Sequence, residues 1–270
     1  MTNSEIKYSK NTKFTVGSRI AVLLVGVALS TAASAVAQSP QRDAAALSTL
    51  QNAVTALGGS NAVASIQDCI LTGSILNADG STNTFHWTIA GSEFRIETTT
   101  ANGGTNVFLS GHGAPAWVMN GKPSSLNSYM ARANLPFYLP PYVLVQELNN
   151  PIYTVKYVGV VQLNGTNVVQ VHVSDDSDAI GTLVTSREWY FDPVSFLPVR
   201  VQYREPSNDG PSDYSGATLD MSSFVAFGGV MVPTAIAYAG TSATETISVG
   251  TVTFNSGVSP DVFDPPQGGK

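Results

Sequence analysis

The hydrophobic positions of the chain follow two different periods, and the change falls near residue 69. Before it, apolar residues recur at spacings of three and four, which predicts an amphipathic helix over residues 42–57. Gly58 and Gly59 then supply a helix stop, and Ser60 is placed to cap a second short helix over residues 61–66. This order predicts a pair of helices lying on a sheet, with the chain passing directly into its first strand. The apolar stripe of the first helix consists of Leu47, Leu50, Val54 and Leu57.

From Cys69 onward, apolar positions alternate with polar ones. The segment FHWTI, for example, places Phe85, Trp87 and Ile89 on one face of a strand. About a dozen such segments, one of them over residues 182–192, are separated by turn sequences such as NADGS, QLNGTN and YAGTS. Short connections between successive strands predict an antiparallel meander with one apolar face. The expected fold class is α+β, mainly antiparallel β.

Residues 129–150 interrupt this alternation. Pro140 and Pro141 stand where a helix would begin, and the sequence YVLVQELNN that follows predicts a short helix. Two interpretations of this apolar segment are open. It covers something on the apolar face of the sheet, or it simply fills the core, and the sequence favours the second.

The first 37 residues have the pattern of a secretory signal peptide. A basic region precedes the apolar run IAVLLVGVAL at residues 20–29, and Ala35 and Ala37 fit the small-x-small rule for cleavage. We therefore expect cleavage after Ala37, a single domain over residues 38–270 and a periplasmic location. The alternative is an uncleaved N-terminal anchor, which the shortness of the apolar run disfavours.

Composition narrows the class of partner. Residues 38–270 hold nine Lys and Arg against 18 Asp and Glu, a net charge of −9. Phosphate binding needs clustered cations, so we expect no nucleic-acid partner. The one cysteine, Cys69, allows no internal disulfide. Its place at the start of an apolar strand predicts a buried, inert thiol.

Familiar catalytic and metal motifs are missing from the sequence. The histidines His86, His112 and His172 give neither HxH nor HExxH spacing, and there is no G-x-S-x-G sequence. Two acidic loops, SDDSD at residues 174–178 and SNDGPSD at residues 207–213, lack the distal glutamate of a calcium loop. We therefore predict no catalytic residue, no metal site and no cofactor. A hydrolase with dispersed residues, in which His86 or His172 converges on a cavity, is the least favoured alternative.

Apolar and aromatic residues on the predicted strands and in the interrupting segment are the remaining functional signal. On a strongly curved sheet with a helical lid, they would line a cavity for an acyl chain or another apolar ligand. The alternative is that they only fill a core. The candidate cavity residues are Phe85, Trp87, Phe94, Phe108, Trp117, Met119, Phe137, Tyr138, Tyr142, Trp189, Phe191, Met221 and Phe224. Tyr203 shares the strand pattern.

Several segments, taken in order, resemble the LolA/LolB-like family of lipoprotein-carrier proteins and, within it, the outer-membrane lipoprotein-sorting-like group. They are the helix ending in ALGG, the strand EFRIET, the strand-turn-strand VFLSGHGAPAWVMNGK, the hairpin YFDPVSFLPVRVQY, and the closing segments GGVMVPTAIAY and GVSPDVFDPPQG. This shared order spans most of residues 38–270.

The resemblance implies a half-open, strongly curved antiparallel barrel wrapped around a few helices, with an apolar cavity between them. It implies binding and carriage of a lipoprotein's acyl chains or another lipid, without chemistry, by a monomer. Release would go to a membrane or to an inner- or outer-membrane partner protein. Arg95 matches the family's lid-contact arginine, although alternation places it opposite Phe94 and Ile96.

The main functional alternative is a protein-interaction or envelope-stress sensing module on the same fold. It predicts an exposed apolar patch without a deep pocket.

Overall fold

The structure is a computed structural model that describes residues 40–265, except residues 113, 120, 134–136, 208–209 and 241–242. The expected signal peptide and its cleavage site lie outside the described residues and stay predictions. Among the described residues, no helix is both long enough and apolar enough to cross a membrane.

The described chain contains thirteen strands, five α-helices and one 3-10 helix. The helices are α1 (Ala44–Ala56), α2 (Ser60–Ala64), α3 (Tyr129–Ala133), α4 (Pro140–Asn149), α5 (Ala179–Thr185) and η1 (Pro260–Phe263). The strands are β1 (Asp68–Asn77), β2 (Thr82–Ala90), β3 (Glu93–Thr99), β4 (Thr105–Gly111), β5 (Ala114–Met119), β6 (Lys122–Ser125), β7 (Tyr153–Leu163), β8 (Thr166–Asp175), β9 (Arg187–Phe191), β10 (Pro198–Ser207), β11 (Gly210–Phe227), β12 (Val230–Ala239) and β13 (Thr244–Phe254).

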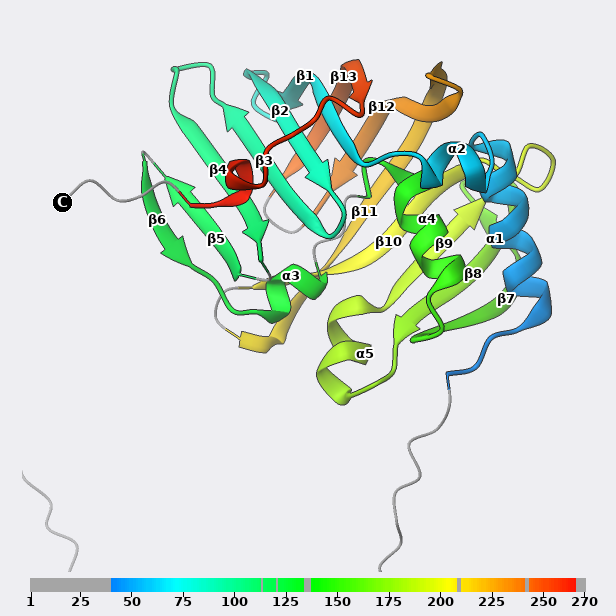
Figure 1. The fold of residues 1–270 in the computed structure, drawn as a ribbon. Coiled ribbons are helices and arrows are strands. Elements are labelled where there is room, and N and C mark those ends of the chain that lie inside the picture. Colours follow the sequence, from blue (N-terminus) through cyan, green and yellow to red (C-terminus); the bar gives the residue numbers. More distant parts are fainter. Residues whose placement is uncertain are drawn as a thin grey trace, which may run out of the picture. The chain divides into compact units, whose positions relative to one another are not determined.

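All thirteen strands belong to one antiparallel sheet (Figure 1). Its order is β6-β5-β4-β3-β2-β1-β13-β12-β11-β10-β9-β8-β7, so two meanders are joined by the pairing of β1 with β13. The sheet begins at β6 and ends at β7, and these two strands do not pair with each other. It is therefore an unclosed barrel, which confirms the fold class expected from the alternation and from the resemblance.

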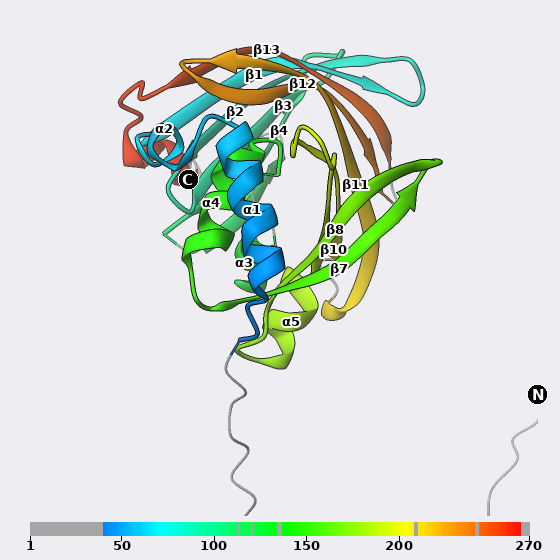
Figure 2. The same ribbon diagram turned by 90° about the vertical axis from the view of Figure 1, so that its right-hand side faces the viewer.

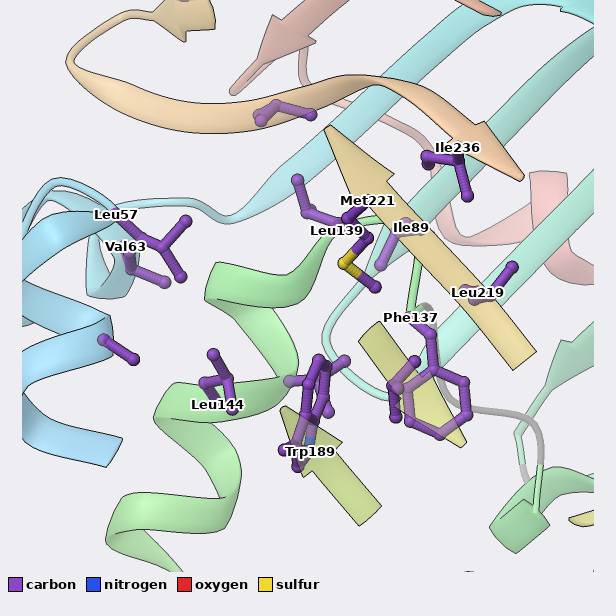
Figure 3. Close-up of a cluster of buried hydrophobic side chains, with 14 of the residues drawn as sticks. Leu57, Val63, Ile89, Phe137, Leu139, Leu144, Trp189, Leu219, Met221 and Ile236 are labelled. Carbon is purple, nitrogen blue, oxygen red and sulfur yellow. The ribbon is translucent and has the colours of Figure 1, made fainter. Parts of the chain in front are cut away.

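The sheet curves around α1 and α4, which lie on its concave side (Figure 2). A single apolar cluster joins the two helices to the inner face of the strands. In Figure 3, Leu144 of α4 lies beside Trp189 of β9, and both side chains are fully buried. The concave side is thus largely filled where α4 crosses it, because large side chains of the helix and the strands pack together there.

The N-terminal end of α1 is tied to α4 and to the edge of the sheet. Backbone hydrogen bonds join Asp43 and Gln41 to Val155 of β7, at 2.9 and 2.7 Å. The guanidinium of Arg42 donates to the carbonyl oxygens of Leu148 and Asn150, both at 2.6 Å, at the C-terminal end of α4. A cation at this end of a helix satisfies carbonyl groups that have no partner within the helix. This contact holds α4 against the sheet from one end.

The double glycine after α1 allows the chain to leave the helix at a close backbone contact. Gly58 has φ of +121°, and a Cβ atom there would lie 2.4 Å from the carbonyl oxygen of Gly229, in the turn between β11 and β12. Next to it, the backbone N–H of Met231 donates to the carbonyl of Leu57 at 3.0 Å. The end of α1 therefore packs directly against the sheet at Gly58, and only glycine fits at this position.

Gly58→Ala is expected to lower the free energy of unfolding by about 1–3 kcal/mol, since the new methyl group meets backbone atoms in a left-handed conformation. Gly59→Ala is the control, because Gly59 also has a positive φ, +89°, but has open space at the Cβ position. Urea denaturation of both variants measures the difference. Equal losses would show that backbone strain alone, and not the close approach to Gly229, requires glycine at residue 58.

The structure differs from the sequence-based elements in several places. The first helix begins at Ala44 rather than residue 42, and Ser60 lies inside α2 while Gly59 takes the capping position. Residues 182–185, expected in a strand, belong to α5, because the side chain of Asp178 accepts a hydrogen bond from the backbone N–H of Gly181 and caps that helix. Cys69 is 1% exposed, as expected for a buried thiol, and burial raises its pKa to about 12.

Candidate functional site

The inner face of the sheet holds a cavity of about 300 Å³ on the side not filled by α4. Strands β2 to β5 supply one wall, and the segment before α4 supplies Phe137 and Tyr138. The rest comes from β10, β12, β13 and Ala243, which directly precedes β13. The lining residues are Trp87, Ile89, Phe94, Ile96, Thr98, Asn106, Phe108, Trp117, Phe137, Tyr138, Tyr203, Glu205, Tyr238, Ala243 and Glu245.

Strand alternation places these side chains on one face. On β3, for example, Phe94, Ile96 and Thr98 line the cavity, so Arg95 and Glu97 between them point to the opposite face. The same period selects Trp87 and Ile89 on β2. The cavity wall is thus a direct product of the alternation of apolar residues along adjacent strands.

Aromatic rings pack against one another around the cavity. The ring centroids of Phe94 and Phe108 lie 5.0 Å apart, and those of Phe108 and Trp117 lie 5.9 Å apart. Trp87 packs on Tyr138 at 4.2 Å. Trp117 is 38% exposed, which places this part of the wall at the protein surface. Such rings form a rigid, mainly apolar wall that favours an apolar ligand.

One part of the wall is acidic and phenolic. The hydroxyl of Tyr238 donates to the carboxylate of Glu205, with both oxygens at 2.9 Å, and the hydroxyl of Tyr203 donates to it at 3.2 Å. Glu245 is the direct cross-strand partner of Tyr238. Burial, together with the nearby charge of Glu205, raises the pKa of Glu245. Burial and both carboxylates also raise the pKa of Tyr138.

Six of the thirteen candidate cavity residues line this cavity: Trp87, Phe94, Phe108, Trp117, Phe137 and Tyr138. Phe85, Trp189, Phe191 and Met221 are instead buried in the main core, where Phe85 stacks on Trp87 at 3.9 Å. Phe224 and Tyr142 are partly buried against that core, and the hydroxyl of Tyr142 donates to the carbonyl of Gly91. Met119 is 52% exposed outside the lining.

Arg95 lies on the outer face of the sheet, which does not match a lid contact. Its guanidinium pairs with Glu97 at 2.9 Å and donates to the carbonyl of Val262 at 3.4 Å, beside the C-terminal helix η1. The arginine that reaches α4 from the sheet is Arg187 of β9, which forms a buried ion pair with Glu147 of α4. Sequence reasoning missed this pair. Its signal was a charged residue in each of two apolar segments, YVLVQELNN and REWYF.

A serine, a histidine and a glutamate meet on β8 and β9, outside the cavity. His172 Nδ1 lies 2.7 Å from Glu188 Oε1, and His172 Nε2 lies 3.2 Å from Ser174 Oγ. These are the groups of a hydrolytic triad, but the hydroxyl of Ser174 donates its hydrogen to Asp176 at 2.8 Å. Ser174 is also only 1% exposed. His172 is therefore not placed to take a proton from a reachable nucleophile.

The same network sets the charge of Glu188. Burial acts to raise its pKa, but hydrogen bonds with His172 and Gln170 outweigh burial, so the pKa is lowered. His86, the other candidate for a dispersed catalytic site, is exposed and does not line the cavity. The hydrolase alternative requires His86 or His172 to converge on the cavity, and neither residue does so.

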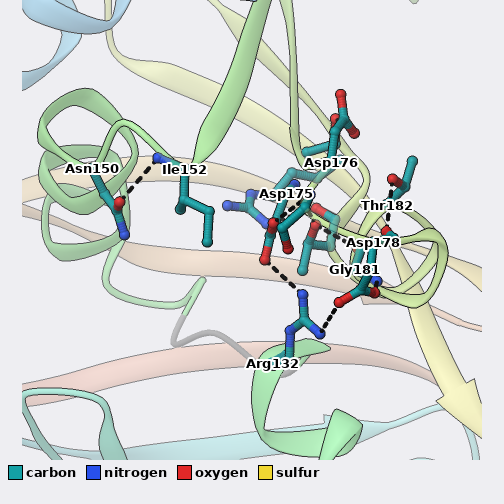
Figure 4. Close-up of polar contacts among 12 residues, drawn as sticks. Arg132, Asn150, Ile152, Asp175, Asp176, Asp178, Gly181 and Thr182 are labelled. Atoms are coloured by element: carbon teal, nitrogen blue, oxygen red, sulfur yellow. Dashed lines mark hydrogen bonds and ion pairs between the residues drawn. The ribbon is translucent and has the colours of Figure 1, made fainter. Parts of the chain in front are cut away.

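The acidic loop SDDSD has a structural role. Arg132 of α3 pairs with Asp175 at 2.7 Å and with Asp178 at 3.2 Å, joining α3 to the loop before α5 (Figure 4). The side chains of the second acidic loop, from residue 207 to residue 213, lie outside the described residues. Across the part of the chain that is described, there is no group of three or more His, Cys, Asp or Glu placed to hold a metal ion.

Two carboxylates of the cavity were missed in the sequence, although the pattern contained a signal for them. Glu205 follows Tyr203 by two residues on β10, and Glu245 precedes Ile247 by two residues on β13. Each glutamate therefore occupies an inward position of an alternating strand, where an apolar residue is expected.

Comparisons with known proteins agree on the architecture. No protein-family model and no curated protein matches the sequence. A domain named for outer membrane lipoprotein sorting, from Vibrio parahaemolyticus, is 13% identical with a TM-score of 0.52, covering 82% of this chain and 96% of that one. A DUF1329 family protein from Desulfovibrio piger is 14% identical with a TM-score of 0.51, covering 81% and 97%.

A LolA superfamily protein from Nitrosomonas europaea is 12% identical with a TM-score of 0.51, covering 81% of this chain and 97% of that one. Likeness at this level of identity concerns the fold. The chain therefore has the fold seen in the LolA superfamily, an open antiparallel sheet curved around helices.

Proposed function

We propose that the protein binds the hydrocarbon chain of a lipid, or of an acylated lipoprotein, in the cavity and carries it through the periplasm without chemistry. The observation that carries this proposal is the cavity of about 300 Å³ with aromatic walls inside the curved sheet. Two of the similar structures are a lipoprotein-sorting domain and a LolA superfamily protein, and this likeness also supports the proposal of lipid or lipoprotein binding. The periplasmic location rests on the N-terminal sequence pattern.

The size of the cavity limits the ligand. Pockets for small ligands span roughly 300–1,000 Å³, so this cavity stands at the lower end of that range. The space accommodates one short hydrocarbon chain rather than several acyl chains side by side.

Burial of the chain supplies the binding free energy. Each buried methylene contributes about 0.8 kcal/mol, which corresponds to about a fourfold decrease in dissociation constant. A series of linear alcohols from hexanol to octanol is therefore expected to bind more tightly with each added carbon.

Thr98→Trp is expected to weaken octanol binding by at least about tenfold. The indole would fill part of the cavity, and excluding only two methylenes of the ligand already exceeds this factor. Thr98 lines the cavity from β3, and its neighbour Thr99 has the opposite orientation on the same strand. Isothermal titration calorimetry of the purified protein with octanol measures the effect.

Thr99→Trp is the matched control and is expected to bind octanol as the unaltered protein does. A thermal melt of both variants separates lost binding from lost folding. If octanol does not bind the unaltered protein, or if the two variants bind it equally, the cavity is not a hydrocarbon site. Native mass spectrometry of protein purified from a bacterial envelope, followed by organic extraction, would then identify the natural ligand class.

A protein-interaction module is the second candidate function, and the edge strand β7 favours it. Val158 and Val160 of this strand are 50% and 59% exposed. Gln41 and Asp43 already occupy the backbone groups of Val155 on this edge, and the rest of an edge strand can pair with a strand of another protein. Absence of binding by every hydrocarbon probe would favour this candidate over lipid carriage.

A further inference from the structure

Two carboxylates face the same cavity from opposite sides of β11 and β12. Glu205 lies on β10 and Glu245 lies on β13, and both line the cavity wall. Tyr238 connects them, because its hydroxyl donates to Glu205 while its backbone position pairs with Glu245. The charge of Glu205 acts on Glu245 and raises its pKa. The two groups are therefore close enough to repel each other when both are ionised.

No cation of the described chain neutralises this pair of charges. The arginines with ion pairs to acidic residues are Arg95, Arg132, Arg187 and Arg200, and their partners lie elsewhere in the fold. Glu205 accepts hydrogen bonds only from tyrosine hydroxyls among the described residues. Two ionised carboxylates without a counter-charge in a partly buried wall cost free energy, unless one of them takes up a proton or a ligand supplies the positive charge.

A second feature of the cavity is a buried donor that makes no hydrogen bond to the described residues. Trp87 lines the cavity and is 2% exposed, yet its indole N–H has no hydrogen-bond partner within the described residues. Buried N–H groups are nearly always paired in folded proteins. An ordered water or an acceptor atom of a ligand would satisfy this group, whereas an ammonium group would not, because it only donates.

The aromatic rings next to the carboxylates suit one kind of positive charge. Tyr138, Tyr203 and Tyr238 line the cavity together with both glutamates. Ammonium groups are attracted to the faces of such rings, in addition to their attraction to carboxylates. A calcium ion, by contrast, takes six to eight oxygen ligands, and the described residues hold no cluster placed to supply them.

We propose that the ligand is a cationic amphiphile, whose ammonium group lies between Glu205 and Glu245 and whose hydrocarbon chain lies against the aromatic wall formed by Phe94, Phe108 and Trp117. This inference rests on the proposed hydrocarbon-binding function and names the ligand class. The natural molecule is an alkyl amine or a lipid with an ammonium headgroup. Mass analysis of the extracted ligand distinguishes these two sources.

Three probes with the same eight-carbon chain test the proposal by calorimetry below their aggregation concentrations: octylamine, octanol and octanoate. Octylamine is expected to bind at least about tenfold more tightly than octanol, because a charge-assisted contact is added to the same hydrocarbon burial. Octanoate is expected to bind more weakly than octanol, because its carboxylate is repelled by those of Glu205 and Glu245.

The double variant Glu205→Gln, Glu245→Gln keeps the side-chain shapes and removes both charges. It is expected to bind octylamine within about threefold of octanol, because the charges that distinguish the two probes are gone. Glu97→Gln is the control, because Glu97 lies on the outer face and pairs with Arg95. It is expected to keep the preference for octylamine. A thermal melt checks that the variants are folded.

The outcomes separate this inference from the proposed function. If octanol and octylamine bind equally to the unaltered protein, or if the double variant keeps the preference, the cationic site is refuted while hydrocarbon binding stands. Calcium binding that displaces octylamine and disappears in the double variant would show a metal site instead. If none of the three probes binds, the proposed function fails as well.

Discussion

Replacing Arg187 with Met is expected to lower the free energy of unfolding by about 3–5 kcal/mol, the usual cost of leaving one charge of a buried ion pair without its partner. The side chain of Arg187 is 1% exposed, and that of Glu147 is fully buried. Arg187 also donates to the carbonyl of Thr185 at 2.7 Å, and its guanidinium lies 5.9 Å from the ring centre of Phe137. Because Phe137 lines the cavity, we expect the same variant to weaken ligand binding.

The loss of stability in Arg187→Met depends on pH, and the burial of Glu147 determines the sign of this dependence. Burial raises the pKa of Glu147, while Arg187 acts to lower it. Without Arg187, the pKa rises further, so the folded variant binds a proton that the unfolded chain, with a glutamate pKa of about 4.3, releases. The stability of the variant therefore decreases as pH rises above about 4.3. The difference from the unaltered protein is largest at neutral pH and narrows on acidification.

Urea denaturation between pH 4 and pH 8 measures this prediction. Arg200→Met is the matched control, because Arg200 pairs with Asp220 at a site where the aspartate side chain is 44% exposed. A pair of that kind contributes less than about 1 kcal/mol. The double variant Arg187→Met, Glu147→Leu is expected to regain most of the lost stability, since no buried charge is left. A loss for Arg187→Met no larger than for Arg200→Met would refute the structural role of the buried pair.

Asp68→Asn is expected to lower the free energy of unfolding by about 2–4 kcal/mol. Asp68, 5% exposed at the start of β1, accepts hydrogen bonds from the backbone N–H groups of Ser256, Gly257 and Val258 at 2.6, 2.8 and 3.1 Å. An asparagine retains one oxygen and turns an amide group toward donors. The segment after β13 would then lose its attachment to β1.

The pH dependence here has the opposite sign. Burial acts to raise the pKa of Asp68, but the backbone hydrogen bonds outweigh burial, and the pKa is lowered. The contribution of Asp68 is therefore fully present above the unfolded pKa of about 3.9 and is lost as pH falls through the lower folded pKa. Urea denaturation of the variant and of the unaltered protein from pH 7 to pH 2 measures the difference in their free energies of unfolding.

Asp220→Asn is the control for this prediction, because it alters an exposed carboxylate of the same sheet. It is expected to change stability by less than about 1 kcal/mol. A gap between Asp68→Asn and the unaltered protein that stays constant down to pH 2 would contradict the assigned role of the Asp68 charge.

Helices α1 and α4 and most strands were predictable because local sequence determines their period. The stripe from Leu47 to Leu57 agrees with α1, and the alternation at residues 85–89 agrees with β2. The clearest error was at residues 182–185, where apolar residues were assigned to a strand. There the cap provided by Asp178 begins a helix, because a side-chain hydrogen bond to the first turn outweighs a short apolar pattern.

The sequence predicted an apolar cavity on one face of the sheet, but it identified only some of the residues that line it. Alternation identifies two faces of each strand, and it correctly grouped Phe94 with Ile96 and placed Arg95 opposite them. It does not say which part of the inner face a helix will cover. Trp189 is covered by α4 and belongs to the core, whereas Trp87 also borders the cavity.

The sequence by itself determined the antiparallel meander, the acidic surface, the buried thiol of Cys69 and the presence of one aromatic inner face. The tertiary structure alone decided which aromatic residues border the cavity, that Arg187 pairs with Glu147 of α4, and that Glu205 and Glu245 face one cavity. The physical reason is that these properties depend on contacts between segments far apart in the chain. Packing of α4 against β9 fills one part of the concave face and leaves the rest open to a ligand.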